Sequence, residues 1–134
     1  MTYTIMECYY SFMFKKILCI LSVFMILPAF CGELEEAAKN NDKIFLYLYA
    51  KDCSYCVKFN PIYNNISQKY GKNCKFLKIN ADTEYGMNLM RASNAFYVPF
   101  VVMLDNASKT AKSIKPECLL SYICTQKVVE NFIK

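Results

Sequence analysis

Hydrophobic and polar positions divide residues 33–134 into short apolar runs separated by longer stretches with a helical period. Residues 43–50 are apolar nearly throughout, which is typical of a strand covered on both faces. The same reasoning along the chain predicts, in order, a helix at 33–41, a strand at 43–50, a helix at 54–70, a strand at 74–80, a helix at 83–94, strands at 100–104 and 109–114, and a helix at 116–134.

This order of elements predicts an α/β fold with a mixed central sheet of about four to five strands and helices on both faces. The first two strands are joined through a helix and should run parallel, whereas the turn at 105–108 should close the sheet with a hairpin. Gly71 is well suited to end the second helix, and Pro116 to begin the last one.

The first 31 residues follow a different pattern. Lys15 and Lys16 precede an apolar run of about 11 residues, and small residues follow it. This predicts a signal peptide over 1–31, with Met13 as an alternative true start, and a mature domain over 32–134. The protein is then expected to be exported, to a bacterial periplasm or cell envelope first and to an endoplasmic-reticulum lumen second. A lipid anchor on Cys31 and a buried N-terminal helix are weaker alternatives.

Composition narrows the class of protein. The chain has 134 residues, 55% of them hydrophobic and only three of them glycine, which excludes a disordered or low-complexity segment and allows one domain with a real core. The formal net charge is +5, but lysines are spread along the chain with acidic residues between them. That distribution indicates a solvated surface, and no nucleic-acid partner is expected.

The segment Cys53-Ser54-Tyr55-Cys56 lies between the first strand and the second helix. Two cysteines three apart at a helix start share a face and can close a small disulfide. Backbone N–H groups and the helix dipole stabilise a thiolate at Cys53, which should attack a substrate disulfide, and Cys56, one turn deeper, should resolve it. A zinc site would need two more ligands, and the chain has no histidine. A purely structural disulfide is also disfavoured, because so short a loop restrains the unfolded chain little.

Removal of the leader would leave five cysteines, an odd number. Cys118 and Cys124 fall on the helix expected at 116–134, nearly two turns apart, which is too far for an unstrained bond. We therefore expect Cys74, Cys118 and Cys124 to be buried small apolar residues, with a structural bridge among them as the alternative.

Three further motifs stand in register with the cysteine pair. Pro61 lies five residues after Cys56, and the segment 78–82 reads Lys-Ile-Asn-Ala-Asp. Val98-Pro99 lies about 40 residues after the cysteine pair, just before a strand. Together with the element order, they resemble the thioredoxin fold over residues 33–134. The resemblance implies that Pro61 kinks the active-site helix and that Pro99 follows a cis bond. That bond would turn the backbone of Val98 toward the cysteines, where it can pair with an extended substrate segment.

The chain departs from thioredoxins proper at the site. Ser54-Tyr55 stands where those proteins usually carry Gly-Pro, Tyr47 replaces their buried aspartate, and Phe100 follows the proline in place of threonine. An x-Tyr inner dipeptide resembles the exported thiol:disulfide oxidoreductase branch of the thioredoxin-like superfamily. Tyr55 is then a candidate substrate contact. Tyr47 and Lys78 are candidates to support the site from beneath, although a plain core tyrosine is an equal alternative.

These features predict an extracytoplasmic thiol–disulfide oxidoreductase that exchanges disulfides with protein thiols through the Cys53–Cys56 pair. No cofactor is expected beyond that disulfide, and no metal. A monomeric reductase resupplied by a membrane electron donor or acceptor is favoured over an isomerase, because no dimerisation domain is evident. The alternative is a non-enzymatic thioredoxin-like binding module of an envelope or secretion assembly.

Overall fold

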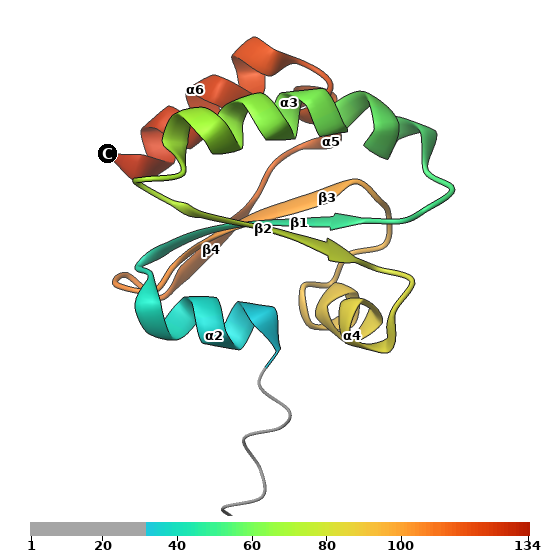
Figure 1. Ribbon diagram of the computed structural model, residues 1–134, viewed down its shortest axis with the longest axis horizontal. Coiled ribbons are helices and arrows are strands. Elements are labelled where there is room, and N and C mark those ends of the chain that lie inside the picture. Colours follow the sequence, from blue (N-terminus) through green and yellow to red (C-terminus); the bar gives the residue numbers. More distant parts are fainter. Residues whose placement is uncertain (1–31) are drawn as a thin grey trace, which may run out of the picture. The chain divides into compact units, whose positions relative to one another are not determined.

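The computed structural model describes residues 32–134, so the signal peptide expected over 1–31 lies outside the described residues. The domain contains helices and strands in the expected order (Figure 1). They are α2 (Glu33–Asn40), β1 (Lys43–Tyr49), α3 (Ser54–Tyr70), β2 (Lys75–Asn80), α4 (Glu84–Ala92), β3 (Phe100–Asp105), β4 (Thr110–Ser113), α5 (Pro116–Leu119) and α6 (Tyr122–Ile133).

The four strands form one mixed sheet in the order β2-β1-β3-β4. β1 runs parallel to β2 and antiparallel to β3, and β3 and β4 form an antiparallel hairpin. Tyr47 in the middle of β1 pairs with Lys78 on one side and with Val101 on the other. The predicted mixed sheet, parallel at first and closed by a hairpin, is confirmed.

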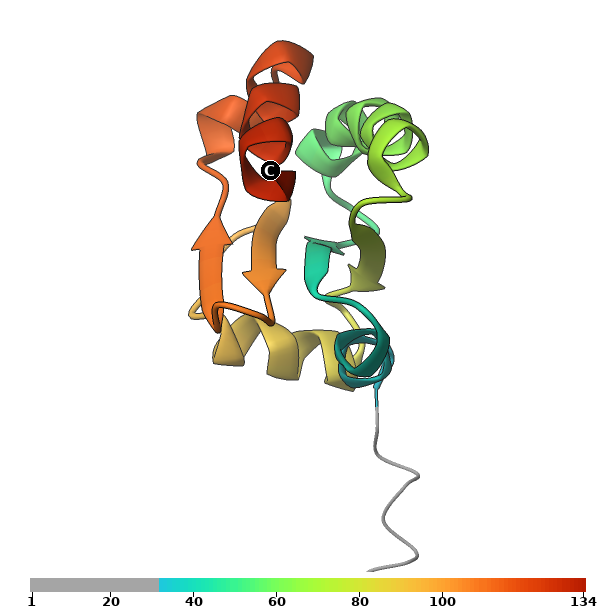
Figure 2. The same ribbon diagram turned by 90° about the vertical axis from the view of Figure 1, so that its left-hand side faces the viewer.

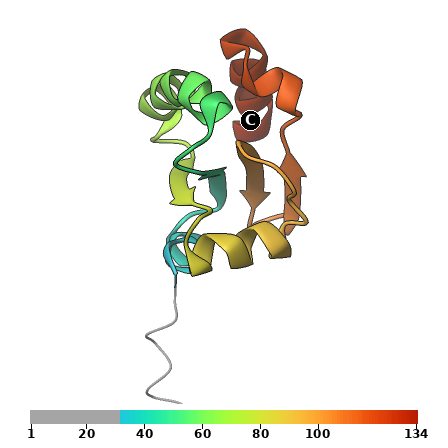
Figure 3. The ribbon, with the colours of Figure 1, turned by 90° about the vertical axis from the view of Figure 1, so that its right-hand side faces the viewer.

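Helices cover both faces of the sheet, as the sequence predicted. α3 and α6 lie over one face, while α2 and α4 lie under the other (Figures 1, 2 and 3). Because side chains of a strand alternate between faces, β1 contributes to two separate cores. Phe45 and Tyr47 pack with α3, α5 and α6, whereas Ile44, Leu46 and Leu48 pack with α2 and α4. Burial on both faces explains the unbroken apolar run at 44–48.

The active-site helix has the predicted bounds, Ser54–Tyr70. Cys53 is its N-cap, with an extended backbone, and Pro61 lies inside it, where the proline removes one backbone donor. Gly71 is at the C-cap as expected, with a right-handed φ of −61°. The buried side chains of helix α3 face the sheet, and they are Cys56, Phe59, Tyr63, Ile66 and Tyr70.

The prediction of one continuous helix over 116–134 is wrong. The helix breaks at residues 120–121, because Ser121 adopts an extended conformation and caps a new helix by accepting a hydrogen bond from the Cys124 N–H at 3.3 Å. The Cys118 carbonyl at the break accepts two hydrogen bonds, one from the Ser121 N–H at 3.0 Å and one from the buried Thr125 hydroxyl at 2.9 Å.

This break also overturns the expected separation of the two cysteines. In a straight helix, six residues would place the Cα atoms about 9 Å apart. Across the corner between α5 and α6 the Cys118 and Cys124 Cα atoms are 5.3 Å apart, and the two residues form a disulfide. Cys74, by contrast, is free and buried as predicted, and burial raises the pKa of its thiol to about 11.

Candidate active site

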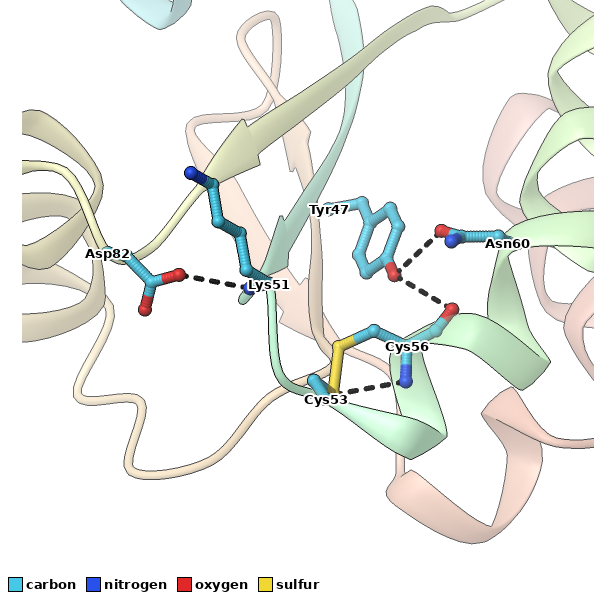
Figure 4. Close-up of a disulfide and its surroundings, with 6 residues drawn as sticks. All are labelled: Tyr47, Lys51, Cys53, Cys56, Asn60 and Asp82. Atoms are coloured by element: carbon cyan, nitrogen blue, oxygen red, sulfur yellow. Dashed lines mark hydrogen bonds between the residues drawn. A yellow bond between two sulfur atoms is a disulfide. The ribbon is translucent and has the colours of Figure 1, made fainter.

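Cys53 and Cys56 form a disulfide at the start of α3, with their Cα atoms 5.2 Å apart (Figure 4). Cys53 is half-buried, and its Sγ accepts a hydrogen bond from the Cys56 N–H at 3.1 Å. Cys56 is only 2% exposed and belongs to the core beneath α3. The first sulfur is therefore the more accessible of the two, and it already lies against a backbone donor of the type that stabilises a thiolate.

Tyr47 reaches the site from the middle of β1. Its fully buried ring directs the hydroxyl toward two acceptors, the Asn60 Oδ1 at 3.1 Å and the Cys56 carbonyl at 3.4 Å (Figure 4). Burial, with smaller contributions from neighbouring tyrosines, raises the pKa of Tyr47 to about 12. The hydroxyl thus keeps its proton at neutral pH and acts as a donor that ties the sheet to the active-site helix.

Asn60 is a site residue that the sequence did not single out. It lies on α3 four residues after Cys56, so the two residues share one face of the helix. The four-residue spacing from Cys56 is the sequence feature that could have indicated Asn60 as a site residue. Asparagine is common on the polar faces of helices, however, so the spacing alone does not distinguish Asn60 from an ordinary surface residue.

Lys78 lies beside the tyrosines and makes no hydrogen bond or ion pair to either cysteine among the described contacts. Its ammonium group is 4.8 Å from the centroid of the Tyr49 ring and 5.6 Å from that of the Tyr47 ring. Such contacts stabilise the rings modestly, by about 0.5–1 kcal/mol at an exposed site. Lys78 therefore supports Tyr47 rather than the sulfur atoms.

The loop before Cys53 is anchored to the next strand–helix connection. The Asp82 carboxylate accepts a hydrogen bond from the Lys51 backbone N–H at 3.0 Å (Figure 4). This bond joins residue 51, which closely precedes the cysteine motif, to the end of the Lys-Ile-Asn-Ala-Asp segment. The aspartate of that motif thus has a visible structural role, holding the loop that presents Cys53.

A groove of about 400 Å³ runs beside the cysteine motif and brings together three predicted residues, Tyr55, Val98 and Pro99. The Val98–Pro99 peptide bond is cis. The remaining lining residues are Tyr97, Pro116, Glu117 and Leu120. Sequence reasoning missed the wall from residues 116–120, because it assigned them to the first turns of one long helix. The break at Leu120–Ser121 is what gives this wall its shape.

No group of three or more histidine, cysteine or acidic side chains within residues 32–134 is arranged to hold a metal ion. In the same part of the chain, no helix is both long enough and apolar enough to span a bilayer.

The sequence also matches a family model. The Thioredoxin model covers residues 30–120. The chain belongs to the thioredoxin family. Its fold is the thioredoxin fold, as the sequence predicted, and thioredoxins need no cofactor. No curated protein matches the sequence of this thioredoxin-family member.

Solved structures show the same fold. A mutant thioredoxin from Halobacterium salinarum is 19% identical with a TM-score of 0.64, and the match covers 76% of this chain and 84% of that one. Thioredoxin-2 of the malaria parasite is 25% identical with a TM-score of 0.59, covering 68% and 84%. The J-Trx1 fragment of ERdj5 is 14% identical with a TM-score of 0.63; the match covers 76% of this thioredoxin-family chain but only 49% of the fragment.

Proposed function

We propose that this protein is an extracytoplasmic thiol–disulfide oxidoreductase that exchanges disulfides with protein substrates, in the reductase direction. The observation that carries the proposal is the asymmetry of the Cys53–Cys56 pair. Cys53 caps helix α3 and is half-buried, two residues before Tyr55 of the groove lining, whereas Cys56 is buried in the core. Membership of the thioredoxin family supports the same activity.

The exchange begins with the reduced pair. The Cys53 thiolate attacks one sulfur of a substrate disulfide, so that a Cys53–substrate bond forms, the substrate S–S bond breaks, and the departing thiolate takes up a proton. Cys56 then loses its proton and attacks the Cys53 sulfur. This second step forms the Cys53–Cys56 bond and releases the second substrate thiol. Two electrons have passed to the substrate, and a membrane electron donor would return two to the oxidised pair.

The surroundings of the pair suit these steps. The Cys56 N–H that bonds Cys53 Sγ at 3.1 Å can stabilise the thiolate formed there. Val98 and Pro99 line the groove beside Tyr55, where an extended substrate segment can pair with the Val98 backbone as an added strand. In this role Cys53 is the nucleophile, Cys56 the resolving residue, and Val98, Pro99 and Tyr55 bind substrate.

Trapping of substrate tests the assignment of the two sulfurs. We expect Cys56→Ala to accumulate covalent complexes with disulfide-containing substrate proteins during expression, because the mixed disulfide that Cys53 forms by attacking a substrate disulfide can no longer be resolved. Cys53→Ala is the matched control and should trap none. Complexes seen only with Cys53→Ala would reverse the assignment.

Export and the direction of exchange are further parts of the proposal. The basic and apolar leader pattern supports removal of residues 1–31, after which the chain would act outside the cytoplasm as a monomer. N-terminal sequencing of the secreted form should begin near Gly32. A full-length chain retained in the cytosol would contradict export without affecting the exchange chemistry.

A non-enzymatic binding module remains a second candidate. One observation favours it: the similar thioredoxin-2 is described as a component of the malaria parasite's protein secretion machinery. An insulin-reduction assay separates the two candidates. Turnover that disappears in Cys53→Ala supports the oxidoreductase, whereas an unreactive but folded protein would favour the binding module.

A further inference from the structure

The groove beside Cys53 contains a single charge among its lining residues. Six of the seven are apolar or aromatic, and Glu117 is the exception. The apolar surface is accessible, since Tyr55 is 56% exposed and Leu120 46% exposed. Glu117 is itself solvent-exposed, so its carboxylate can favour a cationic side chain in this groove by the modest amount typical of an exposed ion pair.

Glu117 has no ionic or hydrogen-bonding partner within residues 32–134. Glu130 and Asp82, by contrast, do have partners: Glu130 bonds Tyr70 and Gln126 and faces Lys69, and Asp82 accepts from Lys51. Neither of two neighbouring lysines forms an ion pair with Glu117. Lys115 is the N-cap of α5, two residues before Glu117, and the Lys58 ammonium lies 5.5 Å from the ring centroid of Tyr55, another residue of the groove lining.

The backbone that carries Glu117 is held rigidly. The next two residues, Cys118 and Leu119, are buried, and Cys118 is bonded to Cys124. The Thr125 hydroxyl holds the Cys118 carbonyl as well. Because this backbone is already ordered, a ligand that meets Glu117 has to order only the glutamate side chain and not the segment that carries it.

We propose that Glu117 determines substrate specificity by selecting polypeptides that carry a lysine or arginine two residues from an apolar residue, near the reactive cysteine. This inference rests on the proposed function and names its substrate class. A strand added at Val98 would present alternate side chains to the groove, so an apolar residue can lie against Tyr55 and Leu120 while the cation lies at Glu117.

Two disulfide-linked peptides that differ at one position test the proposal. One carries Leu and Lys two residues apart near the cysteine, and the other carries Leu and Glu at the same positions. We expect the wild type to reduce the lysine peptide with a kcat/KM about fivefold higher, the upper range for an exposed ion pair. Glu117→Gln should bring the ratio close to one, and Glu117→Lys should invert it. Glu84→Gln, on the opposite face of the sheet, is the matched control and should keep the wild-type ratio.

Raising the salt concentration should shrink the preference of the wild type and leave the ratio of Glu117→Gln unchanged. Equal kcat/KM for both peptides in the wild type would overturn the inference while leaving the proposed function intact. If neither peptide is reduced, the proposed function fails, and the inference is then decided by binding. Fluorescence anisotropy measures the binding of labelled peptides, with serine in place of cysteine, to the Cys53→Ala/Cys56→Ala protein. The lysine peptide must bind more tightly than the glutamate peptide, and Glu117→Gln must remove the difference. Equal binding of the two peptides would overturn the inference.

Discussion

Removal of the Cys118–Cys124 disulfide should destabilise the domain by about 2–3 kcal/mol. The bond closes a loop with a sequence separation of six. In the chain-entropy model, a loop of this size lowers the entropy of the unfolded chain by about 7 cal/mol/K, or about 2 kcal/mol at 25 °C. Cys118 is also buried against the core, so truncation to alanine removes packing worth on the order of 1 kcal/mol.

Urea unfolding followed by far-ultraviolet circular dichroism measures the effect. With a slope of about 1–2 kcal/mol/M for a domain of this size, the midpoint of Cys118→Ala/Cys124→Ala should fall by about 1–3 M. A Cys53→Ala/Cys56→Ala protein isolates the second bond, because Cys118–Cys124 is then the remaining disulfide within residues 32–134. A phosphine reductant should lower its stability by about 2 kcal/mol. The variant lacking all four cysteines should not respond to reductant.

The reasoning would be refuted by unfolding free energies that agree within about 0.5 kcal/mol with and without the bond. That result would mean either that the corner between α5 and α6 stays open in solution or that the unfolded chain is already constrained there. An increased unfolding slope without a midpoint change would instead indicate a more expanded unfolded state.

Two further predictions concern pH and packing. Burial raises the pKa of four groups in the folded state: Cys74 to about 11, and Tyr47, Tyr63 and Tyr85 to about 12. Above pH 9 the folded state therefore binds more protons than the unfolded one. The unfolding free energy should be level below pH 9 and fall as the pH rises toward 12. Tyr63→Phe should flatten this fall, and an unchanged slope would contradict the assignment. Gly86→Ala should destabilise the domain by about 3 kcal/mol in urea unfolding, because the added Cβ would lie 2.0 Å from the Asn80 carbonyl oxygen. Met87→Ala, at the exposed neighbouring residue, is the control and should cost little. Equal losses of unfolding free energy in the two variants would show that α4 shifts freely.

Much of the fold could be predicted from sequence, because local pattern and tertiary packing agree there. The apolar run in β1 is long enough to fill both cores, and the active-site helix begins at a cysteine that can serve as its own N-cap. The proline after Val98 stands just before β3, at the distance from the cysteines that the family requires. Strand, helix and loop signals at these positions have few competing interpretations.

The C-terminal corner could not be predicted in this way. Ser121 is an ordinary polar residue in a sequence window with a helical period, and only the contacts of Cys118, Cys124 and Thr125 favour a break over a continuous helix. One wall of the candidate groove, with Glu117, depends on that break. Asn60 was missed for a related reason, since its function is apparent only once β1 places the Tyr47 hydroxyl beside it.

The tyrosine beneath the cysteine pair changes where protons can go during the proposed exchange. A carboxylate at that depth could take up the proton of the buried sulfur, but Tyr47, with a pKa of about 12, keeps its own proton at neutral pH and cannot take up another. Asn60 is not ionisable, and within residues 32–134 no carboxylate is hydrogen-bonded beneath Cys56. The proton of Cys56 must then leave with water or with the thiolate that the substrate releases in the first step. Where that thiolate takes the proton, the rate at which Cys56 resolves the mixed disulfide would depend on the basicity of the substrate's own leaving sulfur, and so on which substrate is bound.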